Sequence, residues 1–248
     1  MTYGICALSL LPLREAGQHN ALVLSEVLYG ELFQILKTKK YFSQIRLLDD
    51  TIGWIENTQY LEISAKDFDK LSNQPPKIST NLVEFIYNDN QILFPVPIGS
   101  MVQHTAFLGH HFEGETAGHQ PEKNNIRSMA LRFINTPFRK GGKSPFGVDA
   151  DGFVQIVYAL CGIALPRTAV MQAKEGVVLS FIEEAESGDL AFFDDSDGEI
   201  IHVGIILENN YIIHAHGQVR VDRLDQTGIF NPDLRTHTHQ LRLIKSIA

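Results

Sequence analysis

The stretch GGKSPFGVDADGFVQIVY, residues 141–158, joins a glycine-rich segment to an apolar, helix-like one. Its glycine-rich first part predicts a loop. The acidic residues Asp149 and Asp151 then precede an apolar run that ends at Gly162. This pattern is typical of a helix that begins on acidic residues and ends at a glycine. We therefore expect a helix over residues 149–161, with Ala150 in its first turn.

The segments around this stretch predict an α+β fold. Segment 125–136 has apolar residues at helical spacing, and segment 165–176 predicts a short helix that ends at a glycine. Four strand-like segments follow, at residues 200–207, 211–217, 219–224 and 237–247. Helices followed by an antiparallel meander form an α+β domain, which we place at residues 123–248.

Residues 1–122 contain two sets of short apolar runs separated by turns. Runs of this length and spacing are typical of small β-barrels. We place the first barrel at residues 1–63 and the second at residues 64–122. The polar stretch 64–80, which contains Pro-Pro, is interpreted as a linker or surface excursion.

Composition and charge exclude several classes of protein. The 248 residues carry a formal net charge of −8, whereas a surface that binds nucleic acid is basic, so we expect no nucleic-acid partner. We also expect no membrane span, and the N-terminus makes a poor signal peptide. With two cysteines and no C-x-x-C motif, the chain is expected in the reducing cytoplasm; a trimmed upstream signal peptide would instead indicate the periplasm.

Several motifs occur in an order that resembles the NlpC family of papain-like cell-wall cysteine peptidases. They are GGKSPFGVDADGFVQIVY (141–158), LPRTAVMQA (165–173), SGDLAFF (187–193), HVGIIL (202–207) and YIIHAHG (211–217). The motifs CALSLLPLR (6–14), LYGE (28–31) and GWI (53–55) resemble the SH3-like barrels that precede the catalytic domain in γ-D-glutamyl-L-diamino acid endopeptidases. The resemblance covers nearly the whole chain. It implies two N-terminal SH3-like β-barrels followed by a papain-like NlpC-type domain, with the cleft at their junction.

The resemblance also assigns the site residues. In that family the nucleophilic cysteine follows an aspartate at the start of a helix, where the helix dipole stabilises a thiolate. His202 matches the general base, and His214 matches the residue that orients it. Asp149 matches the aspartate that holds the free amine of the peptide. The nucleophile position is occupied by Ala150, and the following serine position by Asp151.

Two positions in the first barrel also depart from the family pattern. A tyrosine that reaches into the catalytic cleft is replaced by Thr51, and a glutamate that helps to bind the amine is replaced by Leu22. We assign both to the ligand-binding side of the cleft. Alanine has no lone pair and no proton to lose, so no acyl-enzyme forms at Ala150. Cys161 lies eleven residues further on, about 16 Å along a helix axis, and is expected to be a core residue.

Three functions follow as alternatives. The first is a catalytically inactive relative of muropeptide endopeptidases that binds a cell-wall peptide or similar small ligand, or acts as a regulator of a protein partner that the sequence does not name. The second is an active hydrolase: either a cysteine peptidase whose cysteine at position 150 has been changed to alanine, or an enzyme that uses Asp151 and His202 in unrelated chemistry. The third is a structural interaction protein whose cleft is filled by Arg139, Lys140 or nearby loops.

The two candidate histidines lie in a predicted β-hairpin. A two-residue turn at 209–210 would place His202 and His214 on opposite faces of the sheet. A three-residue loop, 208–210, would place them on one face, roughly 5–8 Å apart. We predict the three-residue loop if the cleft is preserved. The alternative interpretation of the pair is two inherited buried histidines, each satisfied by one hydrogen bond.

Simpler roles compete with ligand binding at the other polar positions. Asp149 and Asp151 both favour the dipole of the helix they open. Two imidazoles and the Asp151 carboxylate are ligand types that suit zinc, but the sequence does not show that they converge, and we expect no metal and no cofactor. His237 and His239 alternate on the last predicted strand, so we expect them together on a solvent-facing edge.

Overall fold

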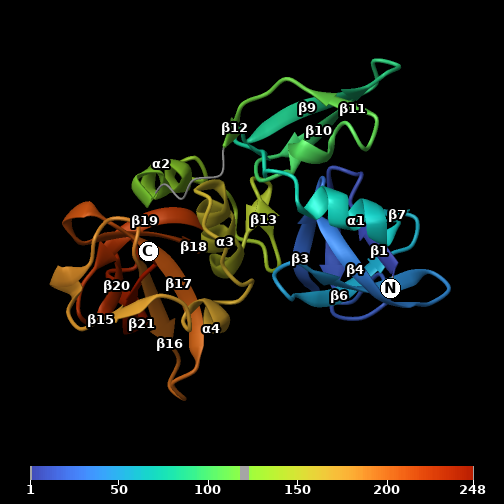
Figure 1. Cartoon of the computed structure of the whole chain (residues 1–248). Helices are drawn as coiled ribbons and strands as arrows, with labels where there is room; N and C mark the ends of the chain where they lie inside the picture. Colours follow the sequence, from blue (N-terminus) through green and yellow to red (C-terminus); the bar gives the residue numbers. More distant parts are fainter. Residues whose placement is uncertain (1, 118–122, 248) are drawn as a thin grey trace. The chain divides into compact units, whose positions relative to one another are not determined.

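The computed structural model of the chain describes residues 2–117 and 123–247 (Figure 1). The chain forms two compact units. The first contains residues 1–120 together with 140–145, and the second contains residues 121–139 and 146–248. Within the described residues, every helix is too short or too polar to cross a membrane.

The first unit is built on a seven-stranded antiparallel sheet with the strand order β3-β2-β6-β5-β4-β1-β7. Its strands are β1 (Thr2–Ile5), β2 (Leu10–Arg14), β3 (Val23–Leu28), β4 (Leu32–Thr38), β5 (Phe42–Leu47), β6 (Ile52–Glu56) and β7 (Leu61–Ile63). Buried residues alternate along β2 and through much of β5, because successive side chains of a strand point to opposite faces. The inward residues of these strands pack into one apolar core, as expected for a small barrel.

A helix follows the sheet at the position where the sequence was interpreted as a linker. Helix α1 (Ala65–Ser72) begins at Ser64, whose hydroxyl oxygen accepts a hydrogen bond from the Asp67 N–H at 3.0 Å. This cap satisfies one of the free N–H groups of the first turn. Leu71 is buried and Phe68 stacks on Tyr3, with ring centroids 4.0 Å apart. Capping and a short apolar face thus form a helix in a stretch whose composition is mostly polar.

The rest of the first unit consists of short strands. Strands β9 (Val83–Asn88), β10 (Leu93–Pro97) and β11 (His110–Phe112) form a sheet with the order β10-β9-β11, and β8 (Ile78–Ser79) pairs with β12 (Thr116–Ala117). A 3₁₀ turn, η1 (Val102–His104), lies between β10 and β11, and β13 (Lys143–Ser144) also belongs to this unit. The division of this half of the chain into barrels at 1–63 and 64–122 stays a prediction.

The helices of the second unit follow the sequence closely. Helix α3 (Ala150–Leu160) confirms the helix expected over 149–161, and helix α4 (Ala169–Gln172) lies within segment 165–176. Helix α2 (Ile126–Leu131) is shorter than segment 125–136, because the chain turns after it and Asn135 adopts a positive φ of 64°. Short elements complete the set: η2 (Lys123–Asn125), β14 (Gly147–Val148) and η3 (Ile182–Glu184).

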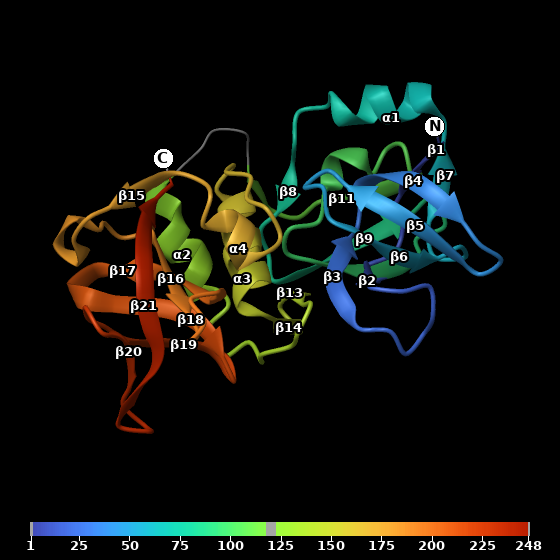
Figure 2. The same ribbon diagram turned by 90° about the horizontal axis from the view of Figure 1, so that it is seen from below.

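A seven-stranded sheet forms the rest of the second unit, in the order β15-β21-β16-β17-β18-β19-β20. Its strands are β15 (Val177–Leu179), β16 (Leu190–Asp194), β17 (Ile200–Leu207), β18 (Tyr211–His216), β19 (Gln218–Leu224), β20 (Gly228–Asn231) and β21 (Thr236–Ser246). β21 also pairs with β20, so the sheet curls round and closes on itself. Figure 2 shows β21 as the long strand that lies beside both β16 and β20.

One helix of the second unit determines where a site would lie. Helix α3 packs against strands β17 and β18, and α2 packs against α3 (Figure 1). Phe153 on α3 is fully buried and meets the Phe133 ring edge to face, with centroids 5.9 Å apart. The apolar face of α3 therefore holds the N-terminus of the helix in a defined place on the sheet.

Candidate active site

Asp149 begins helix α3 and holds its first turn. Its backbone is extended, and its Oδ1 accepts a hydrogen bond from the Gly152 N–H at 2.7 Å. Ala150 is the first residue of the helix and is only 4% exposed. The helix N-terminus presents a partial positive charge at this point. The N-terminus of α3 therefore offers a backbone setting of the kind that lowers the pKa of a cysteine, and Ala150 places a methyl group there.

The Asp149 carboxylate has a second partner. Its Oδ2 accepts a hydrogen bond from an Arg167 guanidinium nitrogen at 2.8 Å, and Arg167 is 4% exposed. A charge-assisted pair between two poorly exposed groups is stronger than a surface ion pair. A peptide amine that bound to Asp149 would have to share this carboxylate with the guanidinium.

Asp151 lies in the first turn of α3 but points toward helix α4. Its Oδ2 accepts a hydrogen bond from the Ala169 N–H at 2.9 Å, at the first residue of α4. Burial raises the pKa of Asp151 to about 6, the Ala169 N–H opposes that rise, and the negative charge of Asp149 adds to it. The Asp151 carboxylate thus links helix α3 to helix α4. This contact is a structural role in addition to its favourable interaction with the dipole of α3.

The predicted hairpin has the three-residue loop. Residues 208–210 form the turn η4 (Glu208–Asn210), and Gly204 pairs with His214. His202 and His214 consequently share one face of the sheet, with ring centroids 5.1 Å apart. The His202 Nε2 lies 2.9 Å from the His214 Nδ1. The prediction of the loop and of the shared face is confirmed.

A carboxylate that the sequence reading did not identify completes a buried chain of polar groups. The Nε2 of His214 lies 3.1 Å from Oδ2 of Asp222, and both side chains are fully buried. Asp222 also forms an ion pair with Arg220, whose Nε is 2.8 Å from Oδ2. Arg220 and Asp222 are two residues apart in the predicted strand 219–224. Residues at this spacing lie on the same face of a strand, so the sequence already indicated that these two side chains are neighbours.

These contacts determine the tautomers of both imidazoles. A carboxylate only accepts hydrogen bonds, so the Nε2 of His214 carries a proton and donates it to Asp222. The Nδ1 of a neutral His214 is then an acceptor, and the Nε2–H of His202 donates to it. The Nδ1 of a neutral His202 consequently keeps a lone pair. This is the arrangement that a general base requires.

The charges around this chain keep the imidazoles neutral. Burial lowers the pKa of His202 well below its usual value, and the neighbouring histidines lower it further. Burial also lowers the pKa of His214, although its hydrogen bond to Asp222 acts in the opposite direction. Burial alone would raise the pKa of Asp222, but hydrogen bonds from His214 and Arg220 outweigh that effect and hold it low. Near pH 7 the chain is a carboxylate followed by two neutral rings.

Comparisons with known proteins agree with this geometry. Residues 135–237 match the NlpC/P60 family, and residues 13–59 match the bacterial dipeptidyl-peptidase Sh3 domain. The C-terminal unit is an NlpC/P60 domain. The first match contains α3 as well as β17, β18 and β19, the three strands that carry the buried chain of polar groups. The second match contains strands β3 to β6.

Curated relatives have peptidase names. The chain is 28% identical to dipeptidyl-peptidase 6 of Lysinibacillus sphaericus, over 88% of this chain and 90% of that protein. It is 31% identical to a γ-D-glutamyl-L-lysine dipeptidyl-peptidase of Bacillus cereus, over 38% of this chain and 29% of that protein. Over 42% of the chain it is 36% identical to a probable endopeptidase p60 of Listeria seeligeri, of which it covers 20%.

A solved structure has the same fold along the whole chain. The crystal structure of an NlpC/P60 family protein from Bacillus cereus covers 98% of this chain, and 99% of that structure is matched, with a TM-score of 0.75 and 15% identity. Together with the two family matches, it establishes the fold class: an SH3-like N-terminal region followed by a papain-like NlpC/P60 domain.

A third histidine joins the pair in the NlpC/P60 domain. His239 stacks on His202, with ring centroids 4.0 Å apart and an angle of 24° between the ring planes. The expectation that His239 lies on a solvent-facing edge is wrong, because its ring is partly buried and stacks on the buried His202. His237 is exposed, as expected, and pairs with Asp225 at 2.9 Å.

The two candidate residues of the Sh3 region lie at the surface of the first unit or in a turn. Leu22 directly precedes β3 and is 58% exposed. Thr51 lies in the turn between β5 and β6, where its N–H donates to the Asp49 side chain at 2.9 Å. Their part in ligand binding stays a prediction. Cys161 ends helix α3 and is buried, which confirms its expected place in the core.

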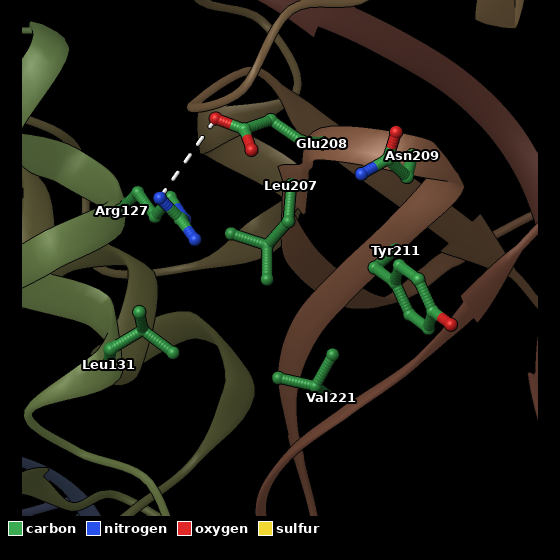
Figure 3. A pocket seen from close by; sticks show the side chains of 7 residues that line it. All are labelled: Arg127, Leu131, Leu207, Glu208, Asn209, Tyr211 and Val221. Atoms are coloured by element: carbon green, nitrogen blue, oxygen red, sulfur yellow. Dashed lines mark ion pairs between the residues drawn. The ribbon is translucent and has the colours of Figure 1, made fainter.

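The NlpC/P60 domain also carries a surface groove of about 290 Å³ at the β17–β18 turn (Figure 3). Figure 3 shows side chains from helix α2 facing side chains from the hairpin, with an ion pair of 3.9 Å between Arg127 and Glu208. Its lining residues are Arg127, Leu131, Leu207, Glu208, Asn209, Tyr211 and Val221. None of the predicted site residues lines it, and the groove is separate from the candidate active site.

Proposed function

We propose that this chain is a catalytically inactive relative of the γ-D-glutamyl peptide endopeptidases and that it binds a peptide of the same class. The observation that carries the proposal is Ala150, the first residue of α3, beside the N-cap Asp149. A peptidase of this kind needs a thiolate at that position. A methyl group neither attacks a carbonyl carbon nor forms a covalent intermediate.

In the described part of the chain, neither the Cys161 thiol nor the Asp151 carboxylate is placed to substitute for the missing nucleophile. Cys161 is at the other end of α3, about 16 Å along the helix axis from position 150, and it is buried. Asp151 directs one carboxylate oxygen to the Ala169 N–H. Loss of catalysis is therefore the simplest outcome of the chemistry around the helix N-terminus.

The ligand class follows from the names of the relatives and from the groups that remain. Relatives in two Bacillus species are named γ-D-glutamyl-L-lysine dipeptidyl-peptidases. A peptide with a free amine and a γ-linked D-glutamate offers one cation and one carboxylate. The Asp149 and Arg167 pair offers the complementary charges, and a peptide would exchange this internal ion pair for two intermolecular ones. We propose L-Ala-γ-D-Glu-L-Lys and its diaminopimelate analogue as ligands.

Calorimetry and a hydrolysis assay test this proposal together. The parent protein is expected to bind the peptide and to release no product from it. The double variant Ala150→Cys, Asp151→Ser is expected to release L-Ala-γ-D-Glu, and a further His202→Ala change to abolish that release. Turnover by the parent protein that disappears in His202→Ala would contradict the proposal. Absence of binding heat at millimolar peptide would instead favour the third alternative, a structural protein with a filled cleft.

An active hydrolase is the second candidate, because the base is intact. The chain of contacts from His202 through His214 to Asp222 is complete, with separations of 2.9 and 3.1 Å. A cysteine at position 150 in the natural protein would then suffice for catalysis. The single variant Ala150→Cys separates this candidate from the first: full activity without the Asp151→Ser change favours a recent replacement of the nucleophile.

We also propose that the protein works in a reducing compartment, the cytoplasm. Both cysteines, Cys6 and Cys161, are buried, and neither is part of a disulfide. This arrangement fits a protein that does not depend on disulfides for its stability. Fractionation of the source cells, with detection of the chain in each fraction, tests the placement.

A further inference from the structure

Three histidines from three strands converge inside the curled sheet of the NlpC/P60 domain. His202 comes from β17, His214 from β18 and His239 from β21. Each ring offers a nitrogen, and the three nitrogens lie within 4.8 Å of one another. We propose that His202, His214 and His239 form a binding site for a divalent transition-metal ion, and that Zn²⁺ is the ion that fits it best.

The spacing of the nitrogens is close to that of a metal site. Zinc binds imidazole nitrogens at about 2.0–2.1 Å, so two nitrogens of a tetrahedral site are about 3.4 Å apart. The facing nitrogens of His202 and His214 are 2.9 Å apart and would separate slightly. His239 is only partly buried, so its ring can turn toward the pair. A movement of about 1.5 Å or less at one ring completes the geometry.

The hydrogen bonds around the site leave the required lone pairs. Asp222 accepts the Nε2–H of His214 at 3.1 Å, which directs the His214 Nδ1 lone pair toward the cluster. Histidine ligands of zinc commonly donate their other ring N–H to a carboxylate in this way. The Nδ1 of His239 lies 2.9 Å from the Thr238 hydroxyl, which leaves its Nε2 for the ion. His202 supplies Nε2 once its proton moves to Nδ1.

The charges near the cluster favour a cation. A metal ligand must be a neutral imidazole, and burial lowers the pKa of each ring, that of His239 to about 4. Arg220 is the cation next to the site, and it pairs with both Asp222 and Asp233 at 2.8 Å. These three charged groups together contribute one negative charge. An ion that binds three neutral rings therefore meets a slightly negative surrounding.

The ligand set selects the kind of ion. Three imidazoles suit zinc, copper or nickel, and they do not suit magnesium or calcium, which prefer oxygen ligands. Zinc accepts three protein ligands together with a water molecule. His216 is exposed and its ring centroid lies 5.0 Å from that of His239. An exposed imidazole therefore lies beside the partly buried His239.

The proposed site differs from the zinc site considered in the sequence analysis. The proposal also departs from the expectation, stated there, that the chain binds no metal. The zinc site considered there combined Asp151 with His202 and His214, but the Asp151 carboxylate is bound to the Ala169 N–H at the start of α4. The proposal also goes beyond peptide binding, because it needs neither Asp149 nor the helix N-terminus. Metal binding and peptide binding can therefore fail independently.

Zinc titration of the full-length protein, purified without a histidine tag and treated with EDTA, tests the site. We expect one zinc ion per chain and visible absorption bands of tetrahedral Co²⁺ when cobalt replaces zinc. His239→Ala is expected to weaken zinc binding at least 10-fold, and Asp222→Asn by about 10- to 100-fold. The matched control is His237→Ala, two residues away on the same strand and exposed, for which the affinity should stay within about twofold.

Melting curves separate loss of the site from loss of the fold. Zinc stabilises a folded protein that binds it, so it should raise the melting temperature of the parent and of His237→Ala, but not that of His239→Ala. Circular dichroism of the metal-free variants checks that they are folded. The proposal is wrong if zinc does not bind with one-to-one saturation. It is equally wrong if His237→Ala weakens binding as much as His239→Ala does, because that result would indicate adventitious binding at surface histidines.

Discussion

The buried carboxylate of Asp151 makes stability depend on pH in a direction that can be worked out. Burial raises its pKa to about 6 in the folded protein, against an ordinary value of 3.8. Below pH 3.8 the group is neutral in both states. Between pH 3.8 and 6 the unfolded chain loses the proton and the folded chain keeps it, so the free energy of unfolding falls as pH rises. Above pH 6 both states are ionised and the whole penalty is present.

The size of the penalty follows from the two pKa values. A difference of about 2 corresponds to about 3 kcal/mol at 1.36 kcal/mol per pKa unit. Asp151→Asn removes the charge and keeps an oxygen that accepts the Ala169 N–H. The folded pKa of about 6 already includes the hydrogen bond from the Ala169 N–H, so we expect a gain of at most about 3 kcal/mol at pH 7.5. For a chain of this size that is a rise of at most about 6–12 °C in melting temperature.

Thermal unfolding followed by circular dichroism at pH 7.5 and pH 4.5 measures the effect. At pH 4.5 the folded Asp151 is mostly protonated but the unfolded one is already mostly ionised, so the advantage of Asp151→Asn should fall to about 1 kcal/mol, and it should disappear only below pH 3.8. The matched control is Asp197→Asn in the exposed turn before β17, which changes the net charge equally. Its melting temperature should stay within about 1 °C of the parent at both pH values.

Two results would refute this reasoning. A lower melting temperature for Asp151→Asn at pH 7.5 would mean that the charged hydrogen bond to Ala169 outweighs the cost of burial. An equal gain at both pH values would mean that the variant acts through packing. The negative charge of Asp149 raises the pKa of Asp151, and the positive charge of Arg167 lowers it. Because the two effects oppose each other, burial is the main cause of the raised pKa.

Three further predictions concern the folded state. Asp222→Ala leaves the buried His214 without its carboxylate and leaves Arg220 paired with Asp233. Urea unfolding should show a loss of about 3 kcal/mol and a smaller loss for Asp222→Asn, and equal losses would contradict this. Gly30 and Gly109 both have a positive φ, but of these two only Gly30 would place a Cβ against a backbone oxygen, at 2.1 Å. Gly30→Ala should therefore lower the free energy of unfolding more than Gly109→Ala. Equal urea midpoints for the two variants would show that the contact does not matter. Cys6 and Cys161 are buried, so a thiol reagent should label neither in the native protein and both after denaturation, and rapid labelling of the native protein would contradict this burial.

Local patterns predicted the parts of the domain that depend on neighbouring residues. Helix α3 follows from an aspartate that caps its first turn and from an apolar run that ends at Gly162. The shared face of His202 and His214 follows from loop length and the period of two along a strand. The polar stretch 64–80 was interpreted as a linker or surface excursion, and its composition did not reveal helix α1, which one capping serine and the contacts of Leu71 stabilise.

The sequence by itself determined that an alanine follows the aspartate that begins α3, because the identity of Ala150 is read directly from the chain. Only the tertiary structure decided that Asp222 and His239 join His202 and His214. Strands β16, β20 and β21 contain register shifts at Phe192/Phe193 and Ile229/Phe230, and a shift of one residue exchanges the two faces of a strand. The position of His239 therefore depends on those shifts and on the closure of the sheet by β20 and β21, which are pairings between distant segments that local patterns do not encode.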